Sequence, residues 1–202
     1  LLTQAKDFFV AGKELNKNVF FGIGKEESPK DMGMRKELID FIEVIHNNQP
    51  LNFHFKHIEF NDEGHMSSPL LSNYQGLKYI FRDLKFSESF EANYSDEEFL
   101  KKENEIAIKY GESAKRAGES YYNLGASIYQ KNLPGAITVF KRSVEVYPYD
   151  INLISTLAAL YVQNNEIPKA IDTYKYAIKV SKSQHYGNGD QFRKEIERLN
   201  NY

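Results

Sequence analysis

The sequence predicts an α/β segment followed by an all-α segment. Residues 1–90 alternate aromatic, apolar runs that are typical of strands with stretches of helical spacing. From residue 95 to the end of the chain, every periodic signal is helical. Residues 119–148 also line up with residues 152–181, so the second segment contains an internal repeat. We therefore expect two structural regions with a boundary near residue 90.

The first region holds two predicted strands, NVFFGIG at 18–24 and LNFHFKHIEF at 51–60. One helix precedes the first strand, an amphipathic helix at 30–48 separates the strands, and a third helix begins near Pro69. This αβαβα order predicts a parallel sheet covered by helices. Because two parallel strands alone make a weak sheet, we expect an incomplete, trailing half of a doubly wound domain, with the start of the protein not present.

The second region, 91–202, is predicted to open with a helix capped by Ser95 and Glu98. Two repeat copies follow, at 118–150 and 151–184, and QFRKEIERLNN at 191–201 is the expected capping helix. The two copies share small residues that let helices approach and large residues that fill the space between them. These positions are Tyr121, Leu124, Gly125, Ile128, Ala136, Phe140, Ser143 and Pro148 in the first copy, and Ile154, Leu157, Ala158, Tyr161, Ala170, Tyr174 and Ala177 in the second.

This pattern resembles the tetratricopeptide repeat, whose period is about 34 residues. The first copy is one residue short in its inter-helix turn, and the second lacks the closing proline. The resemblance implies a peptide-binding groove on the face formed by each repeat's first helix, with candidate residues Tyr122, Asn123, Ala126, Asn152, Ser155 and Thr156. The residues of a carboxylate clamp are not at the matching places. The other interpretation is a structural appendage that packs on the first region or mediates self-association.

Composition excludes several classes of function. The formal net charge is −2 and no basic run carries interleaved aromatics, which argues against nucleic-acid binding. The chain has no cysteine, which excludes disulfides and thiolate chemistry. No apolar run is long enough for a membrane span and no secretory signal opens the chain. The glycines at 22–24 lack the dinucleotide-binding pattern, so no cofactor is expected. The compartment, bacterial periplasm or cytoplasm, stays open.

The candidate catalytic residues lie in the loops that follow the two predicted strands. Gly24-Lys25-Glu26-Glu27 follows the first strand, and His65 lies in the loop between the second strand and the next helix. In α/β-hydrolases the triad acid and histidine occupy two such successive loops. The runs GIGKEES and EFNDEGHMSSPLLSNYQGLKYIF resemble the carboxyl-terminal part of the esterase family that includes esterase D and the enterochelin esterases. Some bacterial members of that family carry tetratricopeptide repeats.

The resemblance implies that His65 is the general base of a serine esterase and that Glu27 orients it. Glu26 and Asp31 are alternatives to Glu27, and some siderophore esterases resemble a serine–histidine dyad without the acid. The expected substrate of the intact parent is a carboxylic ester, of a siderophore or of a short acyl group. A metal site of His54 or His57 with His65 and Glu63 is a weaker alternative, because histidines three apart on a strand point to opposite faces.

The sequence departs from the family at the nucleophile. The 202 residues contain no G-x-S-x-G, and Ser67 and Ser68 lie beside the base in a loop without a strand-to-helix elbow. We therefore expect this chain to be catalytically inert alone, and its exposed strand edges to make it oligomeric or poorly soluble. The alternative function is a non-catalytic interaction protein that works through its repeats.

Overall fold

The computed structural model describes residues 2–10, 15, 17–25, 33–48 and 52–201. The chain divides into two compact units, residues 1–82 and residues 83–202. We call them the sheet unit and the helical unit. Within the described residues, no helix combines the length and the apolar character that crossing a bilayer requires.

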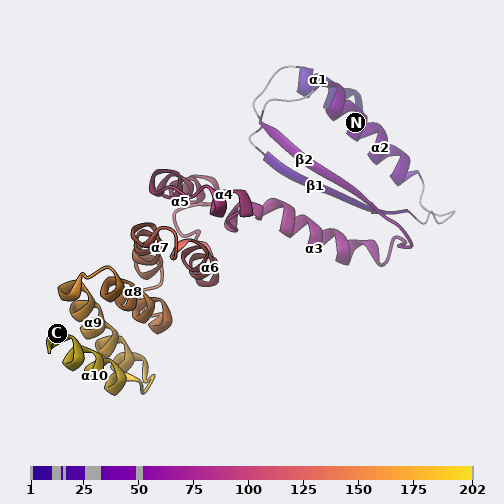
Figure 1. The fold of residues 1–202 in the computed structure, drawn as a ribbon. Coiled ribbons are helices and arrows are strands. Elements are labelled where there is room, and N and C mark those ends of the chain that lie inside the picture. Colours follow the sequence, from indigo (N-terminus) through magenta and orange to yellow (C-terminus); the bar gives the residue numbers. More distant parts are fainter. Residues whose placement is uncertain (1, 11–14, 16, 26–32, 49–51, 202) are drawn as a thin grey trace. The chain divides into compact units, whose positions relative to one another are not determined.

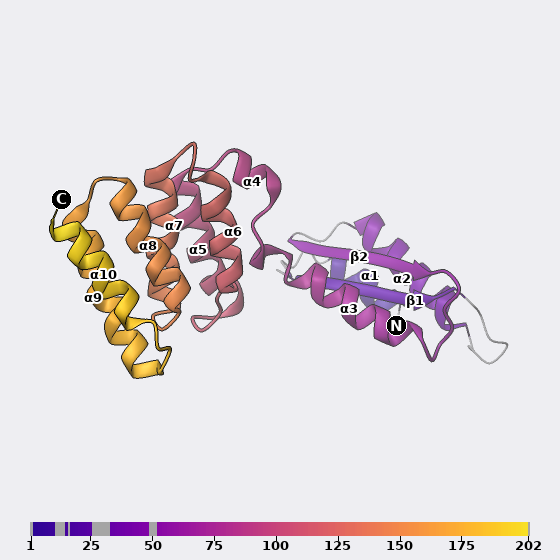
Figure 2. The ribbon, with the colours of Figure 1, turned by 60° about the horizontal axis from the view of Figure 1, so that its bottom comes forward.

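The sheet unit has the predicted αβαβα order. Its elements are α1 (Leu2–Val10), β1 (Lys17–Gly24), α2 (Met34–Asn48), β2 (Phe53–Phe60) and α3 (Ser68–Ile80). β1 and β2 pair in parallel, in a register that runs from Lys17 opposite Phe53 to Gly24 opposite Phe60. Helices α1 and α2 lie on one face of this sheet and α3 lies on the other (Figures 1 and 2). The strands and helices confirm the predicted parallel α/β arrangement of this region.

Aromatic rings fill the face beneath α1 and α2. Phe21 of β1 lies 5.8 Å from Phe41 of α2, measured between ring centroids, and Phe9 of α1 lies 6.0 Å from Phe53 of β2. On the opposite face, α3 approaches β1 closely because both elements offer small residues there. A side chain at Gly22 would meet Ser72, and one at Gly76 would meet the ring of Phe20.

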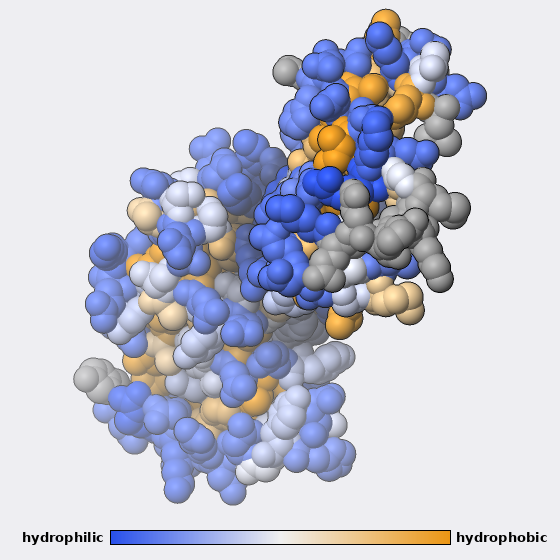
Figure 3. All heavy atoms as spheres, turned by 90° about the vertical axis from the view of Figure 1, so that its right-hand side faces the viewer, coloured by the Kyte–Doolittle hydropathy of each residue, from blue (hydrophilic) through white to orange (hydrophobic). Residues whose placement is uncertain are grey.

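The outer face of α3 and the residue that follows it carry exposed apolar side chains. Leu70, Leu77 and Phe81 are 76%, 58% and 41% exposed. The helix packs on β1 through Ser72, Gly76 and Tyr79 instead, which turns the large aliphatic residues outward. Hydrophobic side chains are also visible at the surface of the sheet unit in Figure 3.

The helical unit consists of antiparallel helices that are joined by short connections. After the 3₁₀ turn η1 (Arg82–Leu84), which spans the boundary, it contains α4 (Glu88–Ala92), α5 (Asp96–Tyr110), α6 (Gly118–Ile128), α7 (Leu133–Val146), α8 (Ile151–Gln163), α9 (Ile167–Gln184) and α10 (Gly189–Asn200). Ser95 caps α5 by accepting a hydrogen bond from the Glu98 amide at 3.3 Å, which is the first half of the predicted capping box. Asn132 and Asp150 cap α7 and α8 in the same way.

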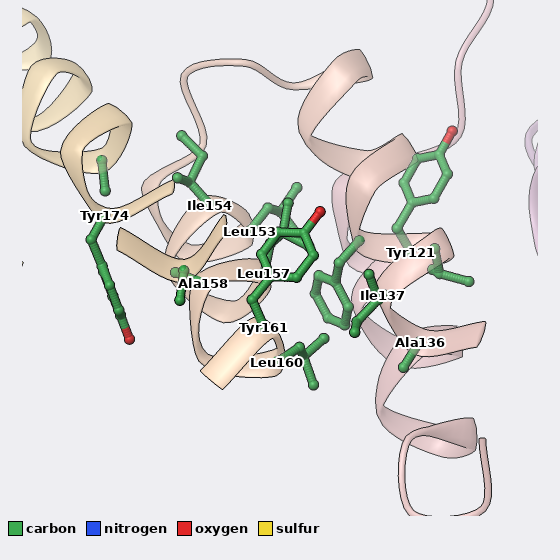
Figure 4. Packing of buried hydrophobic residues seen from close by; sticks show 14 of the residues in the cluster. Tyr121, Ala136, Ile137, Leu153, Ile154, Leu157, Ala158, Leu160, Tyr161 and Tyr174 are labelled. Atoms are coloured by element: carbon green, nitrogen blue, oxygen red, sulfur yellow. The ribbon is translucent and has the colours of Figure 1, made fainter. Parts of the chain in front are cut away.

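The positions shared by the two sequence repeats form the core of this unit. Leu124, Ala136 and Phe140 of the first copy are buried, and so are their counterparts Leu157, Ala170 and Tyr174 of the second. Figure 4 shows these helices packed through such residues. Gly125 of α6 permits the closest approach, because a side chain there would collide with the ring of Phe140 on α7. Pairs α6/α7 and α8/α9 therefore bury equivalent faces.

Residues 83–94, which surround the boundary expected near residue 90, belong to this core. Phe90 of α4 is buried, and Phe86 and Tyr94 pack beside it. The centroids of the Phe86 and Phe90 rings are 5.4 Å apart and the rings are stacked. Three aromatic residues spaced four apart explain the difference, since they give this short stretch enough apolar area to dock on α5 and α6.

A buried charged network joins α5 to α6 and α7. Glu103 and Arg116 are 7% and 2% exposed, and their side chains meet at 2.8 Å. The other carboxylate oxygen of Glu103 accepts hydrogen bonds from Tyr121 at 2.6 Å and from Arg142 at 3.2 Å. Burial and the bond to Glu103 raise the pKa of Tyr121 far above its ordinary value, so this hydroxyl stays a donor. Each buried charged group of this network therefore has an ion-pair partner.

Candidate functional site

His65 lies where the strands of the sheet unit end. β2 finishes at Phe60, and residues 61–67 turn the chain toward α3. Asp62 adopts a left-handed backbone with φ 62° to make this turn. The Ser68 amide then donates to the Gly64 carbonyl at 3.0 Å, which starts α3 directly after the loop. The His65 side chain is exposed and makes no hydrogen bond to another described residue.

The end of β1 supports this loop from beneath. Gly24 is buried, and a β-carbon there would lie less than 3.0 Å from the Glu63 carbonyl group. The Lys25 amide extends the strand pairing by donating to the Phe60 carbonyl at 2.9 Å. The glycine therefore allows the His65 loop to rest directly on the carboxyl end of the neighbouring strand. We call residues 61–67, together with Gly24 and Lys25, the strand-end site.

Glu27, the predicted orienting acid, lies outside the described residues, as do Glu26 and Asp31. Since β1 and β2 are parallel and paired to their last residues, Lys25 at the end of β1 lies beside the start of the loop that holds His65.

The serines beside His65 have structural roles. The Ser67 hydroxyl accepts a hydrogen bond from the Gly64 amide at 3.2 Å within the turn, and Ser68 is 7% exposed at the first turn of α3. Neither lies at a sharp turn from a strand into a helix, where a hydrolase nucleophile would be exposed.

The alternative metal set is not assembled in the described part of the chain. His54 and His57 belong to opposite faces of β2: His54 is exposed, and the Nε2 of His57 is buried without a hydrogen-bond partner. No three His, Cys, Asp or Glu side chains of the described residues gather closely enough to hold a metal ion. This result covers the whole alternative set, because the structure describes His54, His57, Glu63 and His65.

His57 faces α2, next to an ion pair. Arg35 of α2 contacts Glu59 of β2 at 2.6 Å, and this bond lowers the pKa of Glu59. Burial lowers the pKa of His57, opposed by attraction to Glu59 and assisted by Arg35. His57 is therefore a neutral packing residue at neutral pH. It lies on the face of the sheet opposite to α3.

The helical unit has a second candidate site along α6, α8 and α10. Two adjoining hollows, of about 430 and 440 Å³, share Asn152, Ser155 and Thr156. Tyr122 and Glu119 of α6 and Asp150 line the first, while Tyr174 of α9 and Gln191 and Glu195 of α10 line the second. We call this surface the repeat groove.

The repeat groove includes four of the six residues expected from the sequence. Tyr122, Asn152, Ser155 and Thr156 line it, whereas Asn123 and Ala126 are exposed on α6 without lining either hollow. Sequence reasoning missed Glu119, Asp150 and Glu195. A signal was available for Glu119, because it precedes Tyr122 by three residues and so shares its helix face. The cap role of Asp150 could also have been recognised.

Comparisons with known proteins leave the family open. No family model, no curated protein and no solved structure matches the chain. The functional interpretation therefore rests on the residues and geometry of the two sites.

Proposed function

We propose that the sheet unit is the carboxyl-terminal part of a serine carboxylic-ester hydrolase with the α/β-hydrolase fold, and that His65 is its general base. The observation that carries this proposal is the close approach of the Glu63 carbonyl to Gly24, where a β-carbon would collide with it, so that the His65 loop lies on the carboxyl end of the neighbouring parallel strand. Histidine and acid loops of this fold emerge from successive strand ends. The chain order of β1, α2, β2 and α3 matches that requirement.

The chemistry follows from an exposed imidazole at that edge. A serine hydroxyl supplied from outside these 202 residues would give its proton to His65 as its oxygen attacks the ester carbonyl. His65 would then pass the proton to the departing alcohol, leaving an acyl-enzyme. Water would repeat the two steps and release the acid. Glu27 is the residue that we propose for orienting the imidazole, with Glu26 and Asp31 as the alternatives.

Fluorophosphonate labelling of the natural full-length gene product tests this proposal. The reagent reacts with serines that a nearby base activates. We expect one labelled serine in the wild-type protein and loss of labelling in His65→Ala. His54→Ala is the matched control, because His54 is an exposed histidine of the same unit, and it should label normally. If folded wild-type protein stays unlabelled, or if His65→Ala labels at the wild-type rate, the esterase proposal is wrong.

A second function is favoured by the repeat groove. We propose that the helical unit is a tetratricopeptide-type module that binds a peptide segment of a partner protein. The support is the burial of equivalent positions in α6/α7 and α8/α9, together with the hollowed face along α6, α8 and α10. If the labelling experiment fails, the chain is better explained as an interaction protein in which the sheet unit is a scaffold.

A further inference from the structure

The two hollows of the repeat groove differ in how their carboxylates are used. In the α10 hollow, Glu195 already accepts hydrogen bonds from Arg198 at 2.8 and 3.0 Å. In the α6/α8 hollow, the carboxylate of Glu119 has no ion-pair partner among the described residues, and Asp150 has none either. Neither hollow is lined by a lysine or an arginine. The α6/α8 hollow is therefore lined by two carboxylates and by no cationic side chain, while Lys115 lines an adjoining hollow that shares Asp150 and Asn152 with it.

Helix capping accounts for the position of Asp150 but not for its negative charge, and it does not account for Glu119. One oxygen of Asp150 accepts from the amides of Asn152 and Leu153, at 3.0 and 3.2 Å, and so caps α8. That role requires an oxygen acceptor, which asparagine would supply equally well. Glu119 lies in the first turn of α6, where the helix dipole favours an acid, but it caps nothing because no side-chain bond closes that end. Both negative charges remain available to a ligand.

An aromatic ring completes the pocket. Tyr122 is 47% exposed and lines the same hollow as the two carboxylates. Its ring packs edge-to-face against Phe140 of α7 at a centroid distance of 5.9 Å. Carboxylates beside an aromatic face are the combination that attracts a lysine ammonium or an arginine guanidinium. The Ser155 and Thr156 hydroxyls donate to the Asn152 carbonyl at 3.1 and 2.7 Å, so in the same hollow they offer acceptor oxygens to the amides of a peptide.

We propose that the repeat groove selects an extended, positively charged peptide segment, and that the hollow lined by Glu119, Asp150 and Tyr122 takes one of its lysine or arginine side chains. This inference rests on the proposed peptide-binding role of the helical unit and adds the chemistry of the partner. The argument is charge complementarity, since the ligand supplies the cations that the groove lacks.

Fluorescence anisotropy with three labelled octapeptides tests the proposal on the full chain. The peptides are acetylated, amidated and alternate alanine with lysine, glutamine or glutamate. We expect the lysine peptide to bind about tenfold or more tightly than the glutamine peptide at low salt, and the glutamate peptide not to bind. The double variant Glu119→Gln, Asp150→Asn should abolish the preference while keeping the α8 cap. Tyr122→Leu should weaken lysine-peptide binding by a smaller factor.

The control is Glu105→Gln with Asp172→Asn, which removes the same charge from exposed positions outside the groove. This variant should bind the lysine peptide as the wild type does. If the control loses as much affinity as the groove variant, only the overall field acts and the proposed pocket is wrong. Equal binding of all three peptides would retain the peptide-binding role and overturn the charge preference. Failure of all three to bind would overturn both.

Discussion

Leu124 and Leu70 are both leucines on helices, yet Leu124 is completely buried in the helical unit and Leu70 is 76% exposed in the sheet unit. The contrast extends to the rest of each unit. The buried hydrophobic residues of the sheet unit, among those described, are Phe9, Ile42 and Ile45, whereas a continuous cluster runs from Phe90 to Leu199 in the helical unit.

The difference reflects how each architecture buries its apolar surface. Consecutive helices of a repeat pack on their neighbours in the chain, so α6 to α10 satisfy one another locally. A parallel sheet buries strands by placing further strands and helices beside them, and the described part of the sheet unit offers two strands. We therefore expect the helical unit to be the more stable of the two.

The largest decrease in the free energy of unfolding is expected from Glu103→Ala. This change leaves Arg116, which is 2% exposed, without its ion-pair partner, and it removes the acceptor of Tyr121. Loss of one member of a buried pair costs about 3–5 kcal/mol. Urea unfolding followed by far-ultraviolet circular dichroism measures the change in the free energy of unfolding. Glu105→Ala, at an exposed position of the same helix, is the control and should change it little.

The next effect compares the two leucines directly. Leu124→Ala should destabilise the helical unit by about 2–5 kcal/mol, because it opens a cavity in a closed core. Leu70→Ala should alter the stability of the sheet unit by about 0.5 kcal/mol or less. Urea titrations of both variants check this. A large loss from Leu70→Ala would mean that α3 is covered by another surface in solution.

A smaller effect is expected at the strand-end site. Gly24→Ala puts a methyl group against the Glu63 carbonyl, so the His65 loop must move. Overpacking of this kind costs about 1–3 kcal/mol. Gly64→Ala is the control within the same loop, since nothing lies within 4 Å of a side chain there. The His65 resonances in a proton–nitrogen NMR spectrum should shift in Gly24→Ala and much less in Gly64→Ala.

The smallest effect concerns the pH dependence of the sheet unit. Burial lowers the pKa of His57, so below about pH 6.5 the unfolded chain takes up a proton that the folded chain resists. The free energy of unfolding therefore carries no penalty from His57 above that pH, and it decreases as the pH falls below it. His57→Leu should flatten the acid side of the stability profile. His54→Leu, at an exposed position on the opposite face, should leave the slope unchanged, and equal slopes in both variants would exclude His57 as the cause.

The sequence predicted well wherever a residue's environment comes from its near neighbours. Both strands, the helix between them and every shared repeat position from Tyr121 to Ala177 were recognisable from periodicity, since local spacing determines which side of a helix is buried. The groove residues Tyr122, Asn152, Ser155 and Thr156 were implied by the resemblance to the tetratricopeptide repeat, and each lines at least one of the two hollows.

Long-range contacts explain what the sequence left out. Glu103 looks like a surface acid on an amphipathic helix, and only its meeting with Arg116 and Arg142 makes it a core residue. Leu70 and Leu77 look like core residues, and only the small side chains of Ser72 and Gly76 decide that α3 turns another face to the sheet. His65 could be placed in a loop, but its support by Gly24 required the structure.

Hydrogen exchange read by mass spectrometry on the full chain tests the difference between the two units most directly. We expect peptides from α6 to α9 to exchange through a high-energy opening, with protection close to the global limit. Peptides that cover β1, β2 and α3 should exchange at least about a hundredfold faster, because their apolar faces are only partly covered. Equal, strong protection of both sets of peptides would contradict this comparison and show that the sheet unit buries its surface as completely as the helices do.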